Sequence, residues 1–290
     1  MIPNDARPAH AIYRVVRWAA LLAAIWVAMG MAGCMGARAQ PVEPPLGSAQ
    51  APATPGRGAW TVRLGAGALI GPAYPGSEGS RVRPLPLVDI AYRANLPGLD
   101  TIFLNTQQGL GIVALRYGPF SLGGSLGFAP GRDQDLGGRL RGMGDIDAGP
   151  RGSLFLHGNF GPLLLSVQAD RAFGDQEGTT VTLGATYRRR LTPSLSLAGH
   201  LGASWADEDH MQEWFGVTPL QASRTAFPSY RPEAGFRNVT ASLSGNYLFS
   251  ERWVLNATIG VTRLLGDAAD SPIVQRETQP FGLLGLSYRF

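Results

Sequence analysis

The sequence contains no lysine and only one cysteine, Cys34, among its 290 residues. All 25 basic side chains are therefore arginines. A single cysteine cannot form an intrachain disulfide, and a mature chain without Cys34 would also lack a thiolate nucleophile and any cysteine ligand for a metal. These absences exclude disulfide-stapled scaffolds and thiol chemistry.

Long apolar runs are also scarce. The most extended one, Trp18 to Gly33, has sixteen residues, whereas a membrane-spanning helix needs about 20. No later segment reaches the roughly 18 apolar residues of a helical span. The sequence therefore does not describe a helical membrane protein.

The apolar run instead has the surroundings of a secretory signal. Arg14 and Arg17 precede it, and an Ala-Arg-Ala tripeptide that ends at Ala39 follows it, directly before Gln40. This order of charged, apolar and small residues predicts a signal peptide over residues 1–39, with cleavage between Ala39 and Gln40. Met31-Ala32-Gly33-Cys34 leaves an alternative open, in which a lipidated Cys34 begins the mature chain.

Charge gives little indication of a nucleic-acid partner. The formal net charge is +4, but residues 1–39 hold four arginines and one aspartate, which leaves 21 basic and 20 acidic residues after cleavage. Such a balance lacks the basic excess that binds phosphate backbones. We expect no nucleic-acid partner and no cofactor.

The predicted mature chain has two parts that differ in composition. Residues 40–58 are rich in Pro, Ala and Gly and predict a flexible periplasmic lead-in. From there to the end, apolar residues recur at every second position, as in Trp60, Val62, Leu64, Ala66, Ala68 and Ile70, with Leu69 as the exception. We predict an all-β domain over residues 59–290, an antiparallel transmembrane β-barrel in the outer membrane.

The number of alternating segments sets the size of the barrel. Clear segments cover 120–128, 180–188, 195–205, 239–249, 253–261 and 279–290, and weaker ones lie near 81–94, 100–105, 109–117, 145–158 and 162–172. With the first segment they make about twelve strands. Short links alternate with longer ones at 129–144, 173–178, 206–236 and 265–278. Short periplasmic and long extracellular links imply an even count, so ten and fourteen also remain open.

Aromatic residues mark the segment ends and the end of the chain. Tyr288 and Phe290 close an alternating segment, as in the sealing strand of an outer-membrane barrel. Amphipathic rings prefer the level of the lipid headgroups, so two aromatic girdles are expected. Outer-membrane lipid and the barrel assembly machinery are the partners that this interpretation requires.

Several stretches resemble the MipA/OmpV family of outer-membrane proteins. They are G-P-A-Y-P-G-S at 71–77, L-R-G-M-G-D-I-D ending at Asp147, W-F-G-V-T-P-L-Q-A at 214–222, F-P-S-Y at 227–230 and L-G-D-A-A-D-S-P-I-V at 265–274, followed by the closing S-Y-R-F. The family usually has Tyr where Trp214 stands, a change that keeps an aromatic ring.

The resemblance implies a function that the residues alone do not. It implies a non-catalytic scaffold that joins a lytic transglycosylase to a murein synthase, so that cutting and building of the cell wall stay coupled. Family members are also linked to osmotic response, adhesion and antibiotic susceptibility. A narrow passive pore is a second hypothesis, because inward residues such as Arg63 and Arg188, with Ser, Thr and Gly, suit a polar lumen.

Few residues suggest a chemical site. His210 beside Asp207 and Asp209 could form a hydrolytic pair, but no nucleophile accompanies them, and a solvated acidic loop is the simpler interpretation. The same carboxylates could bind Ca²⁺, although the spacing of a calcium loop is missing. Arg188, Arg189 and Arg190 form the one basic run, at a predicted periplasmic turn. A solvated turn is the simpler interpretation, and the run is the candidate contact for an acidic periplasmic partner.

Overall fold

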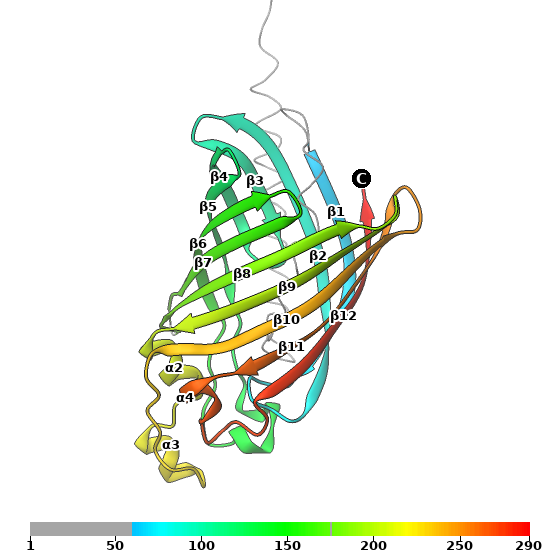
Figure 1. Ribbon diagram of the computed structural model, residues 1–290. Helices are drawn as coiled ribbons and strands as arrows, with labels where there is room; N and C mark the ends of the chain where they lie inside the picture. Colours follow the sequence, from blue (N-terminus) through cyan, green and yellow to red (C-terminus); the bar gives the residue numbers. More distant parts are fainter. Residues whose placement is uncertain (1–59, 175) are drawn as a thin grey trace, which may run out of the picture. The chain divides into compact units, whose positions relative to one another are not determined.

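The computed structural model describes residues 60–174 and 176–290. Within them, twelve antiparallel strands form a closed barrel in which each strand pairs with its neighbours in sequence and β1 pairs with β12 (Figure 1). This confirms the expected strand number over ten and fourteen. The predicted signal peptide, the Ala39–Gln40 cleavage site, Cys34 and the predicted lead-in lie outside the described residues.

The strands range from seven residues in β3 to seventeen in β2. Their bounds are β1 Trp60–Pro72, β2 Ser80–Leu96, β3 Leu99–Asn105, β4 Gly109–Tyr117, β5 Phe120–Ala129, β6 Gly149–Phe160, β7 Leu163–Ala172, β8 Thr179–Arg190, β9 Leu195–Ala206, β10 Gly235–Leu248, β11 Trp253–Leu264 and β12 Thr278–Arg289. The prediction that a strand begins near 145 is wrong, because Ile146 pairs with Arg132 in an isolated bridge of the preceding loop.

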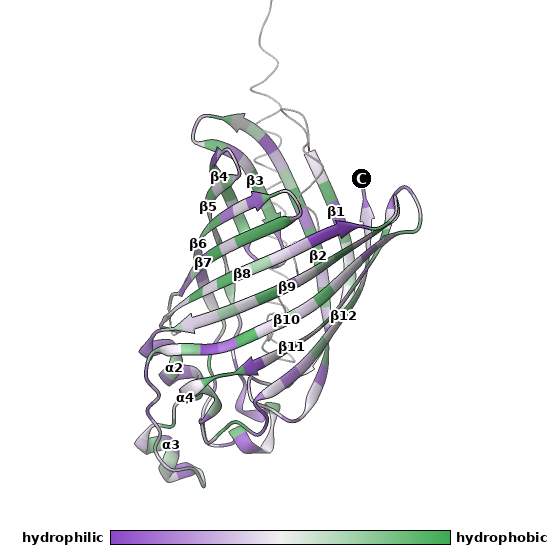
Figure 2. Ribbon diagram, viewed as in Figure 1, coloured by the Kyte–Doolittle hydropathy of each residue, from purple (hydrophilic) through white to green (hydrophobic). Residues whose placement is uncertain are grey.

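Apolar side chains at alternate positions are exposed and form a belt around the barrel. Hydrophobic and hydrophilic residues intermix along the strands of the ribbon (Figure 2). In β1, Leu64 and Ile70 are exposed, while Leu69 is only 3% exposed and faces inward. A monomeric soluble protein would not expose such an apolar surface, but hydrocarbon solvates it. One aromatic residue of the last strand lies inside the barrel: Phe281 is 5% exposed.

Aromatic side chains pair at one end of the barrel. Trp60 and Tyr92, on neighbouring strands, have ring centroids 4.8 Å apart. Tyr288 lies 5.0 Å from Trp253 and 4.8 Å from Phe290. These tilted and edge-to-face contacts have the geometry that favours aromatic pairs. They form the aromatic girdle expected at a membrane interface.

The two ends of the barrel have different connections. At the turn end, where β1 begins and β12 ends, each connection has two to four residues, at 97–98, 118–119, 161–162, 191–194 and 249–252. At the loop end they run over 73–79, 106–108, 130–148, 173–178, 207–234 and 265–277. The three-residue turn 106–108 breaks the predicted alternation. Among the described residues, no helix has the length and apolarity to cross a membrane.

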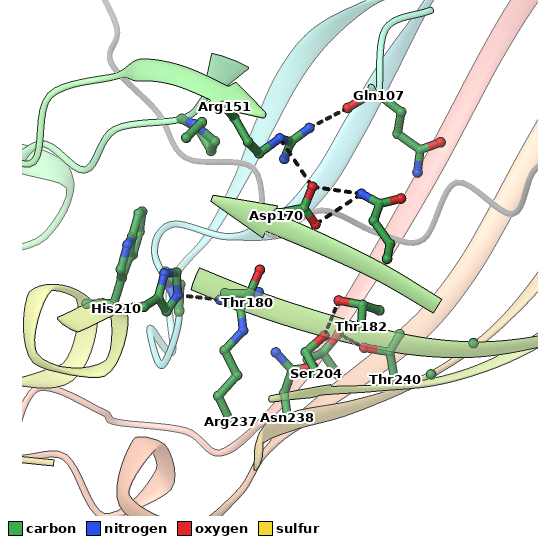
Figure 3. A pocket seen from close by; sticks show the side chains of 18 of the residues that line it. Gln107, Arg151, Asp170, Thr180, Thr182, Ser204, His210, Arg237, Asn238 and Thr240 are labelled. Atoms are coloured by element: carbon green, nitrogen blue, oxygen red, sulfur yellow. Dashed lines mark hydrogen bonds and ion pairs between the residues drawn. The ribbon is translucent and has the colours of Figure 1, made fainter. Parts of the chain in front are cut away.

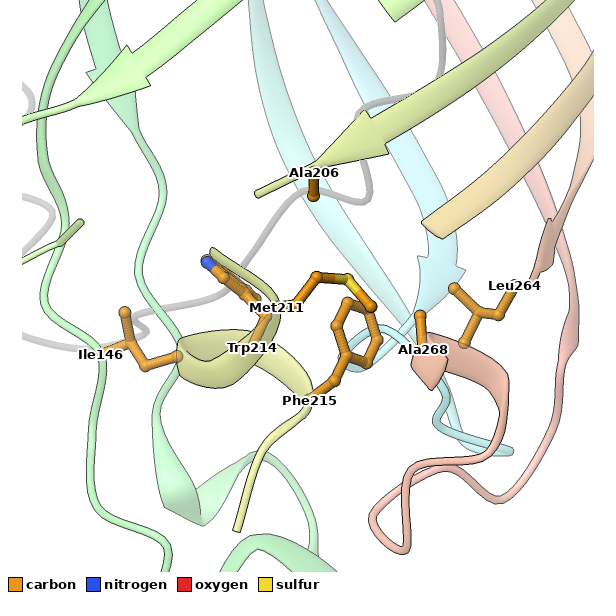
Figure 4. Close-up of a cluster of buried hydrophobic side chains, with 7 residues drawn as sticks. All are labelled: Ile146, Ala206, Met211, Trp214, Phe215, Leu264 and Ala268. Carbon is orange, nitrogen blue, oxygen red and sulfur yellow. The ribbon is translucent and has the colours of Figure 1, made fainter. Parts of the chain in front are cut away.

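The long loops pack together into a cap at the loop end. They contain the short helices α2 (Glu208–Phe215), α3 (Pro219–Arg224) and α4 (Gly266–Ala269), and the 3-10 turns η2 (Gln134–Leu136) and η3 (Gly138–Leu140). Met211, Trp214 and Phe215 of α2 are buried against Ile146, Ala268 and the ends of β9 and β11 (Figure 4). A second apolar cluster, which includes Tyr74, Leu140, Val217 and Ile273, joins the loops 73–79, 130–148, 207–234 and 265–277. The loop 207–234 therefore packs against the loops 130–148 and 265–277 at this end of the barrel.

Candidate functional site in the lumen

The short turn 106–108 folds into the barrel. The side chain of Asn105 orders it, since its Oδ1 accepts hydrogen bonds from the backbone amides of Gln107 (3.0 Å) and Gln108 (2.7 Å). Gly109 follows at φ +79°, a left-handed conformation that glycine adopts readily. Asn105 and Gly109 therefore fix a tight turn at a level where the neighbouring strands β2 and β5 continue.

A polar network holds the turn against the opposite wall. Arg151 of β6 donates from Nη2 to the carbonyl oxygen of Gln107 (2.7 Å), and Gln108 donates to Oε1 of Gln168 on β7 (3.3 Å). Asp170 accepts from Gln168 (2.9 and 3.0 Å) and forms an ion pair with Arg151 (3.8 Å) (Figure 3). Ser153 also donates to Asp170. The charges in the lumen are therefore compensated and hydrogen bonded.

The turn lies between two cavities. The larger, of about 300 Å³, runs along the wall of β6 to β9 from Trp214 of the cap to His157 and Leu164 near the turn end, and the smaller, of about 270 Å³, lies beside Arg63 and Asn256 on the opposite wall. Gln107 and Gln108 are the two residues that line both cavities. The lumen is therefore divided where the hairpin of β3 and β4 bends inward.

Three phenylalanines also occupy the lumen, which the pore hypothesis did not foresee. Phe103, Phe155 and Phe281 are at most 9% exposed. Each ring lies against a glycine of a neighbouring strand, where a Cβ would come within 2.4 Å of the ring, at Gly111, Gly123 and Gly260 respectively. The inward surface is therefore not uniformly made of small polar residues, although Arg63 and Arg188 do face inward as expected.

His210 closes the larger cavity from the cap side, but not as a hydrolytic residue. Asp207 is the N-cap of α2 and accepts from the backbone amides of His210 (3.0 Å) and Thr179 (2.7 Å). His210 Nε2 lies 2.9 Å from the Arg237 guanidinium, which can only donate, and its ring stacks on Trp214. Burial, together with Arg237, holds the pKa of His210 well below its usual value. The predictions that His210 forms a hydrolytic pair with Asp207 and that it lies in a solvated loop are therefore both wrong.

The cap also contains a buried pair of opposite charges. Arg132 is 2% exposed and donates from Nη1 to the carbonyl oxygen of Trp214 (2.8 Å). Burial lowers its pKa to about 10. Burial raises the pKa of Glu213 to about 7, against the opposing attraction of Arg132. Glu213 therefore titrates near neutral pH in the segment that closes the barrel.

The calcium alternative finds no support. Among the residues that the structure describes, no three His, Cys, Asp or Glu side chains come together in a way that could hold a metal ion. Asp207 is occupied by backbone amides, and Glu208 pairs with Arg231 (2.7 Å).

The predicted basic run lies at the turn end. Arg188 faces inward and is half-buried, whereas Arg189 and Arg190 are exposed. Arg190 donates to the carbonyl oxygens of Pro193 (2.6 Å) and Thr192 (3.3 Å), which fixes its guanidinium on the turn. The run is therefore split: two of its side chains reach the surface and one lines the lumen.

Comparison with known proteins identifies the family. A profile of the MltA-interacting protein MipA family matches residues 64–290. The chain belongs to this family. It is 26% identical over 96 residues to the MltA-interacting protein of Escherichia coli K12 and 26% identical over 134 residues to the outer membrane protein YiaT of the same strain. These matches cover 33% and 46% of this chain and 38% and 53% of those proteins, so the chain spans about half of their length or less.

Solved outer-membrane barrels are similar to this MipA-family barrel only distantly. An outer membrane channel from Pseudomonas putida F1 is 12% identical, with a TM-score of 0.41 over 81% of this chain and 96% of that chain. The KdgM porin is 11% identical, with a TM-score of 0.40 over 79% and 99%.

Sequence reasoning missed two exposed arginines of the MipA-family barrel that lie beside Arg189 and Arg190. Arg252 lies in the turn between β10 and β11, and Arg289 ends β12. Arg289 donates to the carbonyl oxygen of Glu251 (3.0 Å), and Arg252 donates to the hydroxyl of Tyr288 (2.8 Å). Isolated arginines near chain turns carry no sequence signal, because only the sequential order of β8 to β12 around the barrel brings them to one sector of the rim.

Proposed function

We propose that this outer-membrane barrel is a non-catalytic scaffold whose periplasmic rim binds enzymes of murein remodelling, a lytic transglycosylase and a murein synthase. The exposed arginine cluster Arg189, Arg190, Arg252 and Arg289 is the observation that supports it most directly. The name of the related Escherichia coli protein, MltA-interacting protein, supports the first of these partners.

Connection lengths support the orientation that this proposal needs. In outer-membrane barrels the short turns face the periplasm and the long loops face outside. The turn end of this barrel therefore faces the compartment that contains murein. The loop end carries the packed cap, whose apolar residues are already buried against one another.

Charge distribution supports an acidic partner. The rim sector between β8 and β12 presents four exposed arginines, and Glu251 is its exposed acidic neighbour. A cluster of fixed guanidinium groups attracts acidic surfaces and forms bidentate pairs with carboxylates. Such contacts weaken as ionic strength rises.

The divided lumen argues against the pore hypothesis. The turn 106–108 separates the two cavities, and the cap covers the loop end. Water and solutes would need to displace the cap to cross. We therefore favour a barrel that acts through its rim over one that conducts, and steady single-channel steps of the wild-type protein in a planar bilayer would reverse that preference.

Binding can be tested with matched charge reversals at the two ends. The barrel in nanodiscs is titrated with a purified soluble form of a lytic transglycosylase from the same envelope, and separately with the murein synthase. Arg189→Glu/Arg190→Glu should weaken binding by about tenfold or more, the loss of at least one charge-assisted contact. Arg224→Glu/Arg276→Glu makes the same charge change on exposed loop-end residues and should bind like the wild type.

Two outcomes would contradict the scaffold. One is that neither enzyme binds the folded barrel at low salt. The other is that the rim and loop-end variants lose binding equally, which would assign the effect to net charge and not to the rim.

A further inference from the structure

The wall of the barrel is incomplete on one side. Strand β2 pairs with β1 as far as Ser80, opposite Pro72, but it pairs with β3 only from Asp89, opposite Asn105. Beyond Asp89 the hairpin of β3 and β4 has ended and its turn bends into the lumen. The outer half of β2, residues 80–87, therefore has a partner strand on one edge only.

Two prolines lie on this open edge. The Val88 amide donates to Thr106 Oγ1 (2.8 Å), at the point where β3 ends, so the Val88 N–H points away from β1. The direction of the N–H alternates along a strand, and Pro84 and Pro86 share the direction of Val88. Both positions lack a donor, and the carbonyl oxygen of Pro86 accepts from the Thr106 hydroxyl (2.7 Å). Proline is the residue that a strand tolerates at an unpaired edge, and it prevents another strand from adding there.

The gap lies within the apolar belt. Val82, on the open edge, is 60% exposed and pairs with the exposed Ile70 of β1. Across the gap, Leu126 of β5 is 70% exposed and pairs with Leu110. Apolar side chains on both sides place the opening in hydrocarbon, where unpaired donors are costly and their removal by proline is stabilising.

The larger cavity reaches this gap from inside. Its lining includes Gln107 and Gln108 of the inward turn, Ala129 and Pro130 at the end of β5, and Pro75 of the first loop. These residues belong to the inward turn below the gap, to the end of β5 beside it and to the first loop above it. Deeper in, the cavity presents the polar groups of Arg151, Asp170 and Thr180 (Figure 3).

We propose that this gap is a side entrance through which a single-chain amphiphile from the outer leaflet binds. Its polar, hydrogen-bonding headgroup occupies the 300 Å³ cavity, and its alkyl chain leaves over Pro84 and Val82 into the bilayer. The volume is at the lower end of ligand pockets, which span about 300–1,000 Å³, so it holds one headgroup and excludes a two-chain lipid with a large sugar head. The site is independent of murein enzymes and of the rim.

Photo-crosslinking tests the entrance on the full folded barrel. The probe is a lysophosphatidylcholine with a diazirine in its headgroup, incorporated into nanodiscs, with labelled peptides identified by mass spectrometry. Labels are expected on the inward turn and on residues 129–131. Ala129→Trp, which places a large side chain at the cavity mouth, should reduce these labels several-fold. Leu201→Trp, an outward substitution of an exposed residue on the far strand β9, should leave them unchanged.

Folding is checked by the heat-dependent gel mobility of the barrel, so that a misfolded variant is not scored. Thr180→Val is a second variant, which should lower labelling several-fold through loss of a hydrogen-bonding group that lines the cavity. Labels confined to the outward belt, or inward labels that Ala129→Trp leaves unchanged in a folded protein, would overturn the proposal. A probe with the diazirine at the end of the alkyl chain should label Val82 and Leu126 instead of the lumen.

Discussion

Arg151 and Gln107 are joined across the lumen by a 2.7 Å hydrogen bond from a guanidinium to a backbone carbonyl oxygen. The bond connects β6 to the only loop-end connection of three residues in the described chain. It makes the position of one turn depend on a strand more than forty residues away, and Asp170 neutralises the charge that this arrangement buries.

The first prediction concerns the division of the lumen. Arg151→Met keeps the length of the side chain but removes the bond to Gln107 and leaves Asp170 without its cation. Loss of a charge-assisted hydrogen bond destabilises the turn by about 1.5–3 kcal/mol. Brief conductance steps should then appear in planar bilayers, whereas the wild type and Arg171→Met, which changes an exposed arginine on β7, should stay silent. A silent Arg151→Met barrel with a disordered turn would show that other contacts divide the lumen.

The second prediction concerns the pH dependence of the cap. The pKa of Glu213 is about 7 in the folded protein, against an ordinary value of 4.5. The folded state therefore favours the protonated form. The stability that this gives is complete below about pH 4.5 and is lost as pH rises through about 7. After allowance for the solvent that reaches this side chain, we expect the free energy of unfolding to fall by about 1–2 kcal/mol.

Hydrogen exchange of residues 207–234 at pH 5 and pH 8 measures this effect. Exchange should be faster at pH 8 after correction for the intrinsic rate, and Glu213→Gln should abolish the difference. Glu233→Gln, at an exposed position of the same loop, is the control. The opposite sign, or a difference that Glu213→Gln retains, would assign the effect to a group other than Glu213.

A third prediction concerns the open edge of β2. Pro86→Ala adds an N–H that points into the gap, and a donor without a partner costs about 1–3 kcal/mol. Pro97→Ala, in an exposed turn, increases the conformational freedom of the unfolded chain in the same way but leaves no unpaired donor in the gap. Urea unfolding in vesicles should show the first variant to be less stable than the second. Equal stabilities would mean that water or lipid headgroups satisfy the new donor.

The fourth prediction concerns the glycines beneath the inward rings. A Cβ at Gly123 would lie 2.4 Å from the Phe155 ring and 2.2 Å from the carbonyl oxygen of Ile112. Gly123→Ala should therefore destabilise the barrel by about 1–3 kcal/mol through overpacking. Gly199→Ala, where no atom lies within 4 Å of the added Cβ, should be nearly neutral in the same urea titration. Equal effects of the two substitutions would show that the wall can shift to accept the methyl group.

Some features could be predicted because they depend on residues close in sequence. The period of two in segments such as 253–261 fixes which side chains face lipid, since a strand turns each side chain to the opposite face of its neighbour. The period does not show which inward position is apolar: the Phe281 ring lies inward against Gly260, and only the register of β11 and β12 identifies that glycine.

By itself, the sequence determined a β-barrel of about twelve strands with an apolar outer belt, long loops at one end and an N-terminal segment with the features of a secretory signal. The tertiary structure alone decided that the lumen is divided, that His210 is buried against Arg237 and that β2 has an open edge. The reason is separation along the chain: Gln108 meets Gln168 across 60 residues and Arg132 meets Trp214 across 82. Such contacts depend on strand register around the closed barrel, which no local pattern encodes.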